Sequence, residues 1–168
     1  MPAYLITGRS GTGKSAICTE LKKRGIQAFD GDNVPDLAGW ENVQTGERIG
    51  KLYPGHDHVG KFKWEWDEQI LNKILGEPGV VFLCGSANNA LSFMDRFEKV
   101  FVLNVAEEEQ RRRINSRQEH DYGKDSTVQD SIIAYQKETV ALARERGATI
   151  IDASPDVEQV VNTILASL

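Results

Sequence analysis

Residues 8–15 read Gly8-Arg9-Ser10-Gly11-Thr12-Gly13-Lys14-Ser15, which satisfies the pattern GxxxxGK[ST] at every specified position. A short apolar run, 3–7, precedes this stretch, and an amphipathic run, 15–24, follows it. A strand that leads through such a turn into a helix is the context in which the pattern binds phosphate. Its glycines let backbone N–H groups turn toward phosphate oxygens, and the helix N-terminus adds its positive dipole end. The sequence therefore predicts a phosphate-binding turn.

The residue types in this turn predict a binding site for a nucleoside triphosphate and magnesium. Lys14 is expected to reach the β- and γ-phosphates, and the Ser15 hydroxyl is expected to bind Mg²⁺. The other residues of the turn expected to hold ATP are Gly8, Ser10, Gly11, Thr12 and Gly13. The alternative is a glycine-rich connection with a chance Lys-Ser, and the strand and helix on either side argue against it.

Composition limits the remaining classes of protein. The 168 residues carry 20 Lys and Arg against 25 Asp and Glu, with 40% hydrophobic residues, which fits one folded domain, 1–168. The net charge of −5 gives no basic surface of the kind that nucleic acids or anionic membranes require. Two cysteines are too few for a disulfide framework, and no basic or long apolar leader precedes the turn. We expect a cytoplasmic protein without a membrane partner.

Short apolar runs alternate with longer amphipathic ones along the chain. The predicted strands are 3–7, 26–29, 80–84, 100–103 and 149–151, and the predicted helices are 15–24, 64–75, 107–117, 128–146 and 157–168. This alternation predicts an α/β fold of three layers, with a five-stranded parallel sheet and helices on both faces. Glycines break every period within 36–63, so we expect no regular structure there, and the length of this connection indicates a functional or mobile segment.

Two carboxylates follow the second predicted strand, in Asp30-Gly31-Asp32. The carboxyl ends of parallel strands form the ligand sites of α/β sheets. One carboxylate could hold a magnesium-bound water while the other accepts the proton of an attacking hydroxyl, as phosphoryl transfer requires. The alternative is an Asp-Gly turn with solvated acids, and its position one strand after the phosphate-binding turn favours function.

Other nucleotide-binding classes lack their second motif. The segment 57–60 spells DxxG but follows no buried strand, and the guanine-reading NKxD is absent, which argues against a GTPase. A motor-type ATPase would place an acid after the strand 80–84, where Gly85 and Ser86 stand. Asp152 follows the last strand and is expected to cap the next turn.

A run of arginines follows the fourth strand. Glu107, Glu108 and Glu109 each stand four residues before an arginine, an arrangement that predicts surface ion pairs and solvated side chains for Arg111 and Arg112. Arg117 has no glutamate at that offset. We therefore rank it above Arg113 as a cation for the transition state. The polar stretch after it, 117–126, is typical of a short lid.

These motifs together resemble the P-loop small-molecule kinases, namely the shikimate, gluconate, adenylate and adenylylsulfate kinases. The segment 28–32 is similar to Phe-x-Asp-Ser-Asp of shikimate kinases, which implies that Asp32 contacts the acceptor hydroxyl and Asp30 supports the metal. The segment 113–117 is similar to the RxxxR that opens the lid in adenylate kinase relatives, which implies that Arg113 packs near the adenine and phosphates and that Arg117 contacts the transferring phosphates. The resemblance implies a cap near 36–75 and a lid near 117–126.

The acceptor is less well defined by the sequence. One segment holds an unusual number of aromatic residues, namely Trp40, Tyr53, Phe62, Trp64 and Trp66. They could line an aromatic pocket for a nucleoside or another ring, or they could form the core of a hydrophobic cap over the sheet. A second group of polar residues leaves two interpretations open: Asn88 and Asn89 contact the acceptor or cap a helix, and His56 and His58 contact the substrate or lie in a polar loop.

The sequence thus predicts an ATP- and Mg²⁺-dependent kinase that transfers the γ-phosphoryl group to a hydroxyl of a small molecule. Its catalytic residues would be Lys14, Asp32 and Arg117, and its metal ligands Ser15 and Asp30. Two alternatives stay open. One is a kinase of 5′-hydroxyl nucleic-acid ends, which the acidic balance disfavours. The other is a nucleotide-binding regulatory protein that transfers no phosphate.

Overall fold

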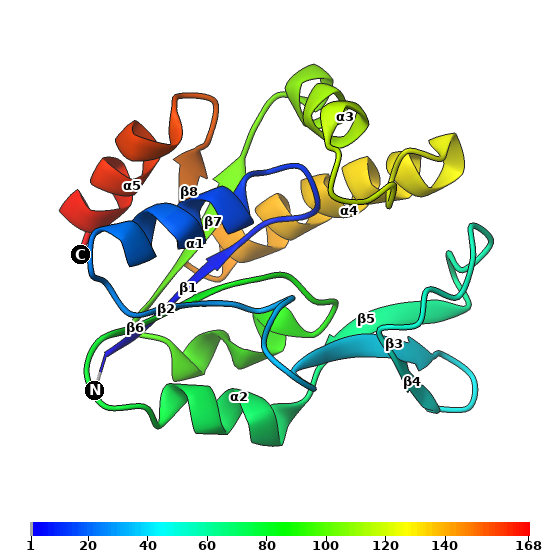
Figure 1. Ribbon diagram of the computed structural model, residues 1–168, viewed down its shortest axis with the longest axis horizontal. Coiled ribbons are helices and arrows are strands. Elements are labelled where there is room, and N and C mark those ends of the chain that lie inside the picture. The colour runs from blue at the N-terminus through cyan, green and yellow to red at the C-terminus, as the bar shows by residue number, and fades with distance from the viewer. Residues whose placement is uncertain (1) are drawn as a thin grey trace.

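The computed structural model describes residues 2–168, and its centre is a sheet of five parallel strands (Figure 1). The strands lie in the order β2-β6-β1-β7-β8. Their bounds are β1 (Ala3–Thr7), β2 (Ala28–Asp30), β6 (Val81–Cys84), β7 (Lys99–Asn104) and β8 (Thr149–Asp152). All four neighbouring pairs are parallel, so the predicted sheet is confirmed. The order places the strand that leads into the phosphate-binding turn at the centre.

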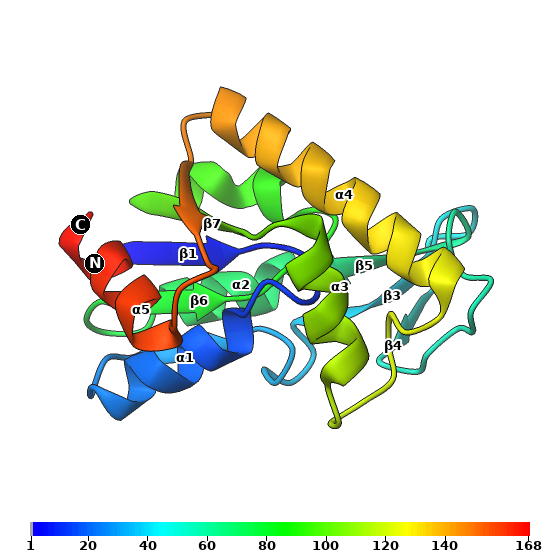
Figure 2. The ribbon, with the colours of Figure 1, turned by 90° about the horizontal axis from the view of Figure 1, so that it is seen from above.

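Helices cover both faces of this sheet (Figure 2). On one face, α1 (Lys14–Lys23) and α5 (Val157–Ala166) bury residues such as Leu21 and Ile164 against Phe101. On the other face lie α2 (Glu68–Leu75), the 3₁₀ helix η1 (Ala90–Arg96) and α4 (Ser126–Glu145). Successive strand residues point to opposite faces, so each strand contributes to both cores. The predicted three-layer α/β fold is confirmed.

A second, antiparallel sheet occupies the segment for which the sequence predicts no regular structure. It consists of β3 (Ala38–Asn42), β4 (Arg48–Gly50) and β5 (Phe62–Trp66), in the order β4-β3-β5. The prediction of an irregular segment is wrong here, and so is the predicted helix start at residue 64. The helix begins at Glu68 because the Asp67 carboxylate accepts a hydrogen bond from the Ile70 amide at 3.0 Å as its N-cap. We call residues 38–75, which contain the three strands, α2 and the loops between them, the cap.

The helices α3 (Glu107–Ser116) and α4 both contact the turn at residues 8–15. The helix α3 follows β7, and the lid, 117–125, connects it to α4. The carboxylate of Asp125 caps α4 by accepting hydrogen bonds from two backbone amides. No helix within residues 2–168 is both long enough and apolar enough to cross a membrane.

Candidate active site

Residues 8–15 form a tight turn from the end of β1 into the start of α1, and we call the backbone of this turn the cradle. Gly11 and Gly13 have φ of 85° and 103°, a left-handed region that side chains with a Cβ rarely adopt. A Cβ on Gly11 would lie 2.8 Å from Cγ1 of Ile114 on α3. A glycine is therefore required both for the turn and for its close packing against α3.

Hydrogen bonds within the turn fix its shape before any ligand binds. The buried Thr12 hydroxyl donates to the Arg9 carbonyl at 2.8 Å, and the Lys14 ammonium donates to the same carbonyl at 3.2 Å. The side-chain amide of Gln110 on α3 donates to the Ser10 carbonyl at 2.8 Å. The Thr12 backbone amide also donates to the Arg9 carbonyl, at 3.3 Å, so both the side chain and the backbone of Thr12 hold the turn.

Charges of both signs surround the Lys14 ammonium. Burial lowers the pKa of Lys14 to about 8, which is the largest single effect on it. The carboxylates of Asp32 and Asp30 oppose that decrease in pKa, whereas the guanidinium groups of Arg9 and Arg117 add to it. The structure therefore brings the predicted Lys14, Asp30, Asp32 and Arg117 into one electrostatic neighbourhood.

The two carboxylates project from the carboxyl end of β2. The Gly31 amide donates to the Cys84 carbonyl at 2.8 Å, which ties this end to β6. The Asp30 carboxylate accepts a hydrogen bond from the Asp32 amide at 3.2 Å, and Lys51 of the cap donates to the Asp32 carbonyl. Within residues 2–168 neither carboxylate forms an ion pair. Both are therefore available to a ligand or a metal.

Arg117 reaches from the lid to the phosphate-binding turn. Its guanidinium donates to the Ser10 hydroxyl at 2.7 Å and lies 3.1 Å from Nε2 of His120. Burial is the main reason that the pKa of Arg117 lies below its ordinary value. The structure thus places the Arg117 guanidinium beside the turn at residues 8–15.

Arg113 lies beside the turn and is tied to three parts of the chain. It donates to the Thr12 carbonyl at 3.4 Å, to the Ala153 carbonyl at 2.9 Å and to the Glu109 carboxylate at 2.8 Å. Its guanidinium thus joins the turn to the loop after β8.

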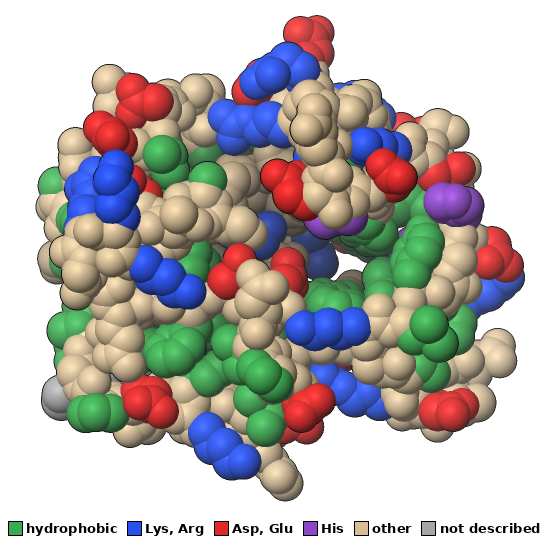
Figure 3. Space-filling model, in the orientation of Figure 1, with side chains coloured by type: hydrophobic (Ala, Val, Ile, Leu, Met, Phe, Trp, Pro, Cys, Tyr) green, Lys and Arg blue, Asp and Glu red, His purple; other side chains and the backbone are tan. Residues whose placement is uncertain are grey.

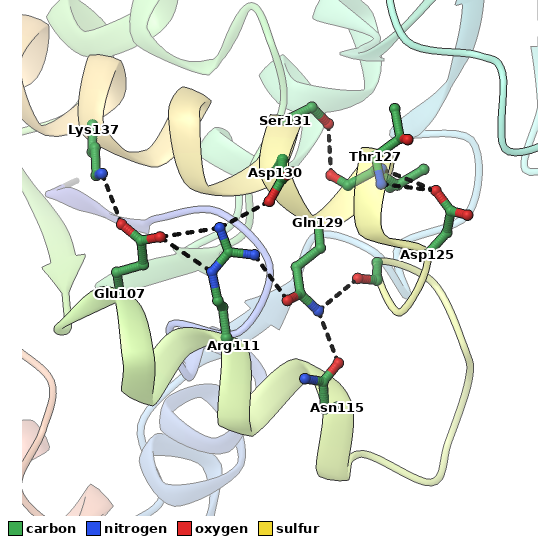
Figure 4. A network of polar contacts seen from close by, with 11 residues as sticks. Glu107, Arg111, Asn115, Asp125, Thr127, Gln129, Asp130, Ser131 and Lys137 are labelled. Carbon is green, nitrogen blue, oxygen red and sulfur yellow. Dashed lines mark hydrogen bonds and ion pairs between the residues drawn. The ribbon is translucent and has the colours of Figure 1, made fainter.

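The glutamate ladder forms only in part. Arg111 pairs with Glu107 as predicted, but it also donates to Gln129 at 3.0 Å and to Asp130 at 2.9 Å, so it connects α3 to α4 (Figure 4). Its side chain is still 31% exposed, so the predicted solvation holds in part, and the two partners on α4 are what the sequence does not reveal. Arg112 is exposed but pairs with Glu109, three residues away.

A magnesium ion would find oxygen ligands here but no complete cage. The Ser15 hydroxyl is exposed and makes no hydrogen bond within residues 2–168, and Asp30 adds a carboxylate nearby. No group of three or more His, Cys, Asp or Glu side chains in this range could hold a metal. One or two protein oxygens completed by phosphates and water are what Mg²⁺ commonly accepts, so the residues fit a nucleotide-bound ion.

The aromatic residues of the cap meet the lid. The rings of Trp40, Tyr53 and His58 pack together with Tyr122 of the lid, with centroids 4.7 Å apart for Trp40 and His58 and 5.8 Å apart for Tyr53 and Tyr122. Burial raises the pKa of Tyr122 to about 12. Seen from the face in Figure 3, the molecule is hollowed beside the cap, with hydrophobic, basic and acidic side chains around the hollow. We call the side chains of Trp40, Tyr53, His58 and Tyr122 the aromatic cluster.

Other candidate residues have structural roles. Trp66 is buried in the core, and Nδ1 of His58 lies 2.8 Å from the Gly55 carbonyl oxygen. Asn88 accepts a hydrogen bond from the Trp64 amide at 3.0 Å, and Asn89 both accepts from and donates to the backbone of Trp66. The two asparagines therefore clamp β5 to the loop after β6, a role that neither predicted alternative describes.

Sequence reasoning does not single out Arg9 and Tyr122, although both lie at the site. Arg9 occupies an unspecified position of the motif, and its side chain leaves the cradle toward α4, where Nε donates to the Thr139 hydroxyl at 3.2 Å. Tyr122 stands in a polar loop whose aromatic partners lie far away in the sequence. No local sequence pattern predicts the contacts of Arg9 or of Tyr122.

Comparisons with known proteins agree with this geometry. Residues 5–134 match the family described as AAA domain. The fold is similar to a shikimate kinase from Bacteroides thetaiotaomicron, with a TM-score of 0.66 and 19% identity over 99% of each chain. A gluconokinase from Sinorhizobium meliloti gives 0.57 and 16% identity, covering 98% of this chain and 90% of that one. A deoxyadenosine kinase from M. mycoides gives 0.56 and 15% identity, covering 98% and 97%.

The curated protein sequences contain no match to this chain. The match to the family nevertheless extends from β1 through the lid into α4, and the structural similarities cover nearly all of the chain. The chain therefore belongs to the AAA domain family, and its fold is that of the P-loop small-molecule kinases.

Proposed function

We propose that this protein is an ATP- and Mg²⁺-dependent phosphotransferase that moves the γ-phosphoryl group to a hydroxyl of a small molecule. The observation that carries the proposal is the surroundings of Lys14. Its ammonium lies at the phosphate-binding turn within electrostatic reach of both Asp32 and Arg117. A triphosphate held by the turn would have its terminal group among these three side chains.

Each side chain then has a distinct role. Lys14 and Arg117 neutralise the charge that spreads over the transferring phosphoryl group. Asp32 orients the acceptor hydroxyl and takes up its proton. Ser15 and Asp30 would hold Mg²⁺, which supplies charge neutralisation across the β- and γ-phosphates. Arg113 helps to hold the nucleotide from the side of α3.

The transfer balances without any further reactant. The acceptor oxygen forms a bond to the γ-phosphorus while the bond between that phosphorus and the β–γ bridging oxygen breaks. The hydroxyl proton moves to the Asp32 carboxylate, and ADP leaves with the electron pair of the broken bond. The lid carries Arg117 and excludes water that would otherwise compete with the acceptor.

The named structural neighbours support a kinase but differ in acceptor. Their titles name kinases of shikimate, of deoxyadenosine and of gluconate. The low identity limits this support to the shared fold, so the acceptor has to be found by experiment.

The direct test is ADP formation with Mg²⁺-ATP and a library of nucleosides, sugars and hydroxy acids. We expect an acceptor to increase ADP release, and we expect Asp32→Asn to decrease kcat by about 10²- to 10⁴-fold with little change in the affinity for an ATP analogue. Asp57→Asn is the matched control because Asp57 lies in an exposed loop of the cap and pairs with the exposed Lys61.

Failure of the library would overturn the kinase proposal. If no acceptor increases ADP release and ATP stays bound and intact, the protein is a nucleotide-binding regulator. If only single-stranded oligonucleotides are phosphorylated, with strong dependence on salt, it is a kinase of nucleic-acid ends.

A further inference from the structure

Arg9 is part of the phosphate-binding turn, but its side chain lies against α4. Its backbone amide donates to Oε1 of Gln136 at 2.8 Å, and its Nε donates to the Thr139 hydroxyl at 3.2 Å. The guanidinium carbon lies 5.6 Å from the centre of the Tyr135 ring. Three residues of one helix thus fix the direction of this cation away from the interior of the cradle.

The outer part of this guanidinium has no anionic partner. Within residues 2–168 neither of its Nη atoms makes a hydrogen bond, and no carboxylate lies within 4.0 Å of it. Glu138 and Glu65 are the carboxylates that raise its pKa, and Glu65 pairs with Lys63 at 3.5 Å. Burial lowers the pKa of Arg9, because water is largely excluded from the group. Arginines as buried as this one are usually paired.

The guanidinium lines a cavity of about 270 Å³. The walls are the end of β1, the loop after β6, η1 and α4. The charged and polar side chains of the lining include Arg9, Ser86, Asn88, Glu138, Thr139 and Arg146. Two arginines and one glutamate leave this lining with a net charge of +1. Hydroxyl and amide groups beside leucine side chains suit a small ligand with one negative charge and several hydroxyls.

We infer that the acceptor binds in this cavity with a carboxylate on the Arg9 guanidinium, and that Arg9 thereby determines which acceptors the enzyme phosphorylates. This inference rests on the proposed function. Two N–H groups of one guanidinium match the two oxygens of a carboxylate. An acceptor bound in this way lies next to the site of the reacting phosphate, because Gly8 and Arg9 of the turn line the cavity and the Lys14 ammonium donates to the Arg9 carbonyl at 3.2 Å. The single excess charge of the cavity favours a carboxylate over a doubly charged phosphate.

The test uses hydroxy acids that are each paired with their own primary amide, with neutral sugars and sugar phosphates in the same library. ADP formation is measured for the wild type, for Arg9→Gln and for Arg112→Gln. The last variant loses the same charge from an exposed position on α3. We expect the wild type to prefer the acid over its amide by about 100-fold or more in kcat/KM. In Arg9→Gln this ratio should approach one through a higher KM for the acid, while Arg112→Gln retains it.

Binding of a non-hydrolysable ATP analogue and the melting temperature are measured for each variant to confirm that Arg9→Gln folds and holds nucleotide. The inference is overturned if neutral sugars or sugar phosphates are the preferred acceptors, or if Arg9→Gln keeps the preference for acids. In those cases the kinase proposal survives, because phosphate is still transferred. If no member of the library is phosphorylated, the proposed function fails and this inference fails with it.

Discussion

At the scale of single residues, the feature that defines the site is the electrostatic environment of the Lys14 ammonium. Burial and two guanidinium groups disfavour the protonated ammonium, and two carboxylates only partly compensate for them. A triphosphate would supply the missing negative charge. Nucleotide binding and protonation of Lys14 are therefore expected to be coupled.

The coupling predicts a dependence of nucleotide affinity on pH. The pKa of Lys14 is about 8 without ligand, and phosphate oxygens raise it, so above pH 8 binding must take up a proton. We expect the affinity for a non-hydrolysable ATP analogue to fall as the pH rises from 7.5 to 9.5, approaching tenfold per unit above pH 8. Isothermal titration calorimetry in buffers of different ionisation enthalpy measures both the affinity and the proton uptake.

Lys14→Met is the control for this dependence. It should bind the analogue at least tenfold more weakly and with no dependence on pH in this range. Because the folded state holds the Lys14 proton less tightly than the unfolded state does, removal of the amine should stabilise the ligand-free protein at pH 7, on the order of 1 kcal/mol. A wild-type affinity that is constant from pH 7.5 to 9.5 would contradict the account of Lys14.

The residues that the sequence could identify are those whose chemistry lies within a few positions along the chain. The turn from Gly8 to Ser15 is such a local pattern, and so is the pair Asp30 and Asp32 after an apolar run. Arg9 belongs to the same turn, but its role depends on Thr139 and Tyr135, which lie some 130 positions away. The motif gives no information about that partner helix.

At the scale of elements, the contact between the turn and α3 predicts a large cost for a small side chain. Gly11→Ala places a methyl group 2.8 Å from Ile114 and 3.0 Å from the Gln110 carbonyl at a φ of +85°. Gly25→Ala is a matched control, since Gly25 has a φ of +75° and open space around its Cβ position. We expect about 1–2 kcal/mol of destabilisation from strain alone at Gly25.

Gly11→Ala should cost about 1–3 kcal/mol more than this control and should also weaken nucleotide binding, which Gly25→Ala should not. Urea denaturation and calorimetric titration measure the two effects. Equal stability of the two variants would show that the turn does not pack against α3 as described.

A second prediction concerns the attachment of the lid. The buried side chain of Gln129 on α4 donates to Asn115 at the end of α3 and to the carbonyl of Gly123 in the lid, while Arg111 donates to its oxygen (Figure 4). Gln129→Leu removes all three hydrogen bonds and leaves polar groups without partners. We expect a loss of about 1–3 kcal/mol in stability and faster proteolysis within 117–124.

Lys137→Gln is the control for Gln129→Leu, because Lys137 also connects α4 to α3 through Glu107 but does so at the exposed surface. It should change stability by less than about 0.5 kcal/mol and leave the proteolysis of the lid unchanged. Unchanged proteolysis in Gln129→Leu would mean that the lid is held elsewhere.

The strands of the main sheet could be predicted because each is a short apolar run between amphipathic segments. The cap could not, and Trp66 shows the reason. Trp66, Ile70 and Ile74 are spaced four apart, which is typical of one helix face, yet Trp66 ends a strand and only the two isoleucines are helical. The alternation of Phe62, Trp64 and Trp66, and the capping residue Asp67, indicate a strand that ends before the helix. The antiparallel partners that decide between strand and helix lie 20 to 28 residues away in the sequence.

At the scale of the whole molecule, the aromatic cluster is where the cap and the lid meet. Tyr122 is the lid's only member of this cluster, and it contacts Trp40, Tyr53 and His58. The cap residues precede β7 in the sequence and the lid residues follow it, so this contact links two parts of the chain that lie far apart in the sequence.

Tyr122→Leu should therefore affect the acceptor more than the nucleotide. It removes three ring contacts, each worth about 0.5–1.5 kcal/mol, and should raise the KM for the acceptor at least fivefold with little change in the affinity for ATP analogues. Tyr122→Phe, which retains the ring, should restore the wild-type KM. Tryptophan fluorescence, which reports on Trp40, should shift in the leucine variant alone, and an unchanged spectrum together with an unchanged KM would contradict the linking role of this contact.

The central claim is that the turn at 8–15 directs the terminal phosphate of a bound nucleotide toward Asp32. The most direct test is a crystal structure with Mg²⁺ and a non-hydrolysable ATP analogue. We expect the γ-phosphorus to lie between the Lys14 ammonium and the Asp32 carboxylate, with room for an alcohol oxygen between the carboxylate and the phosphorus. A γ-phosphate that faces away from Asp32, or a carboxylate packed against it with no such space, would contradict the account.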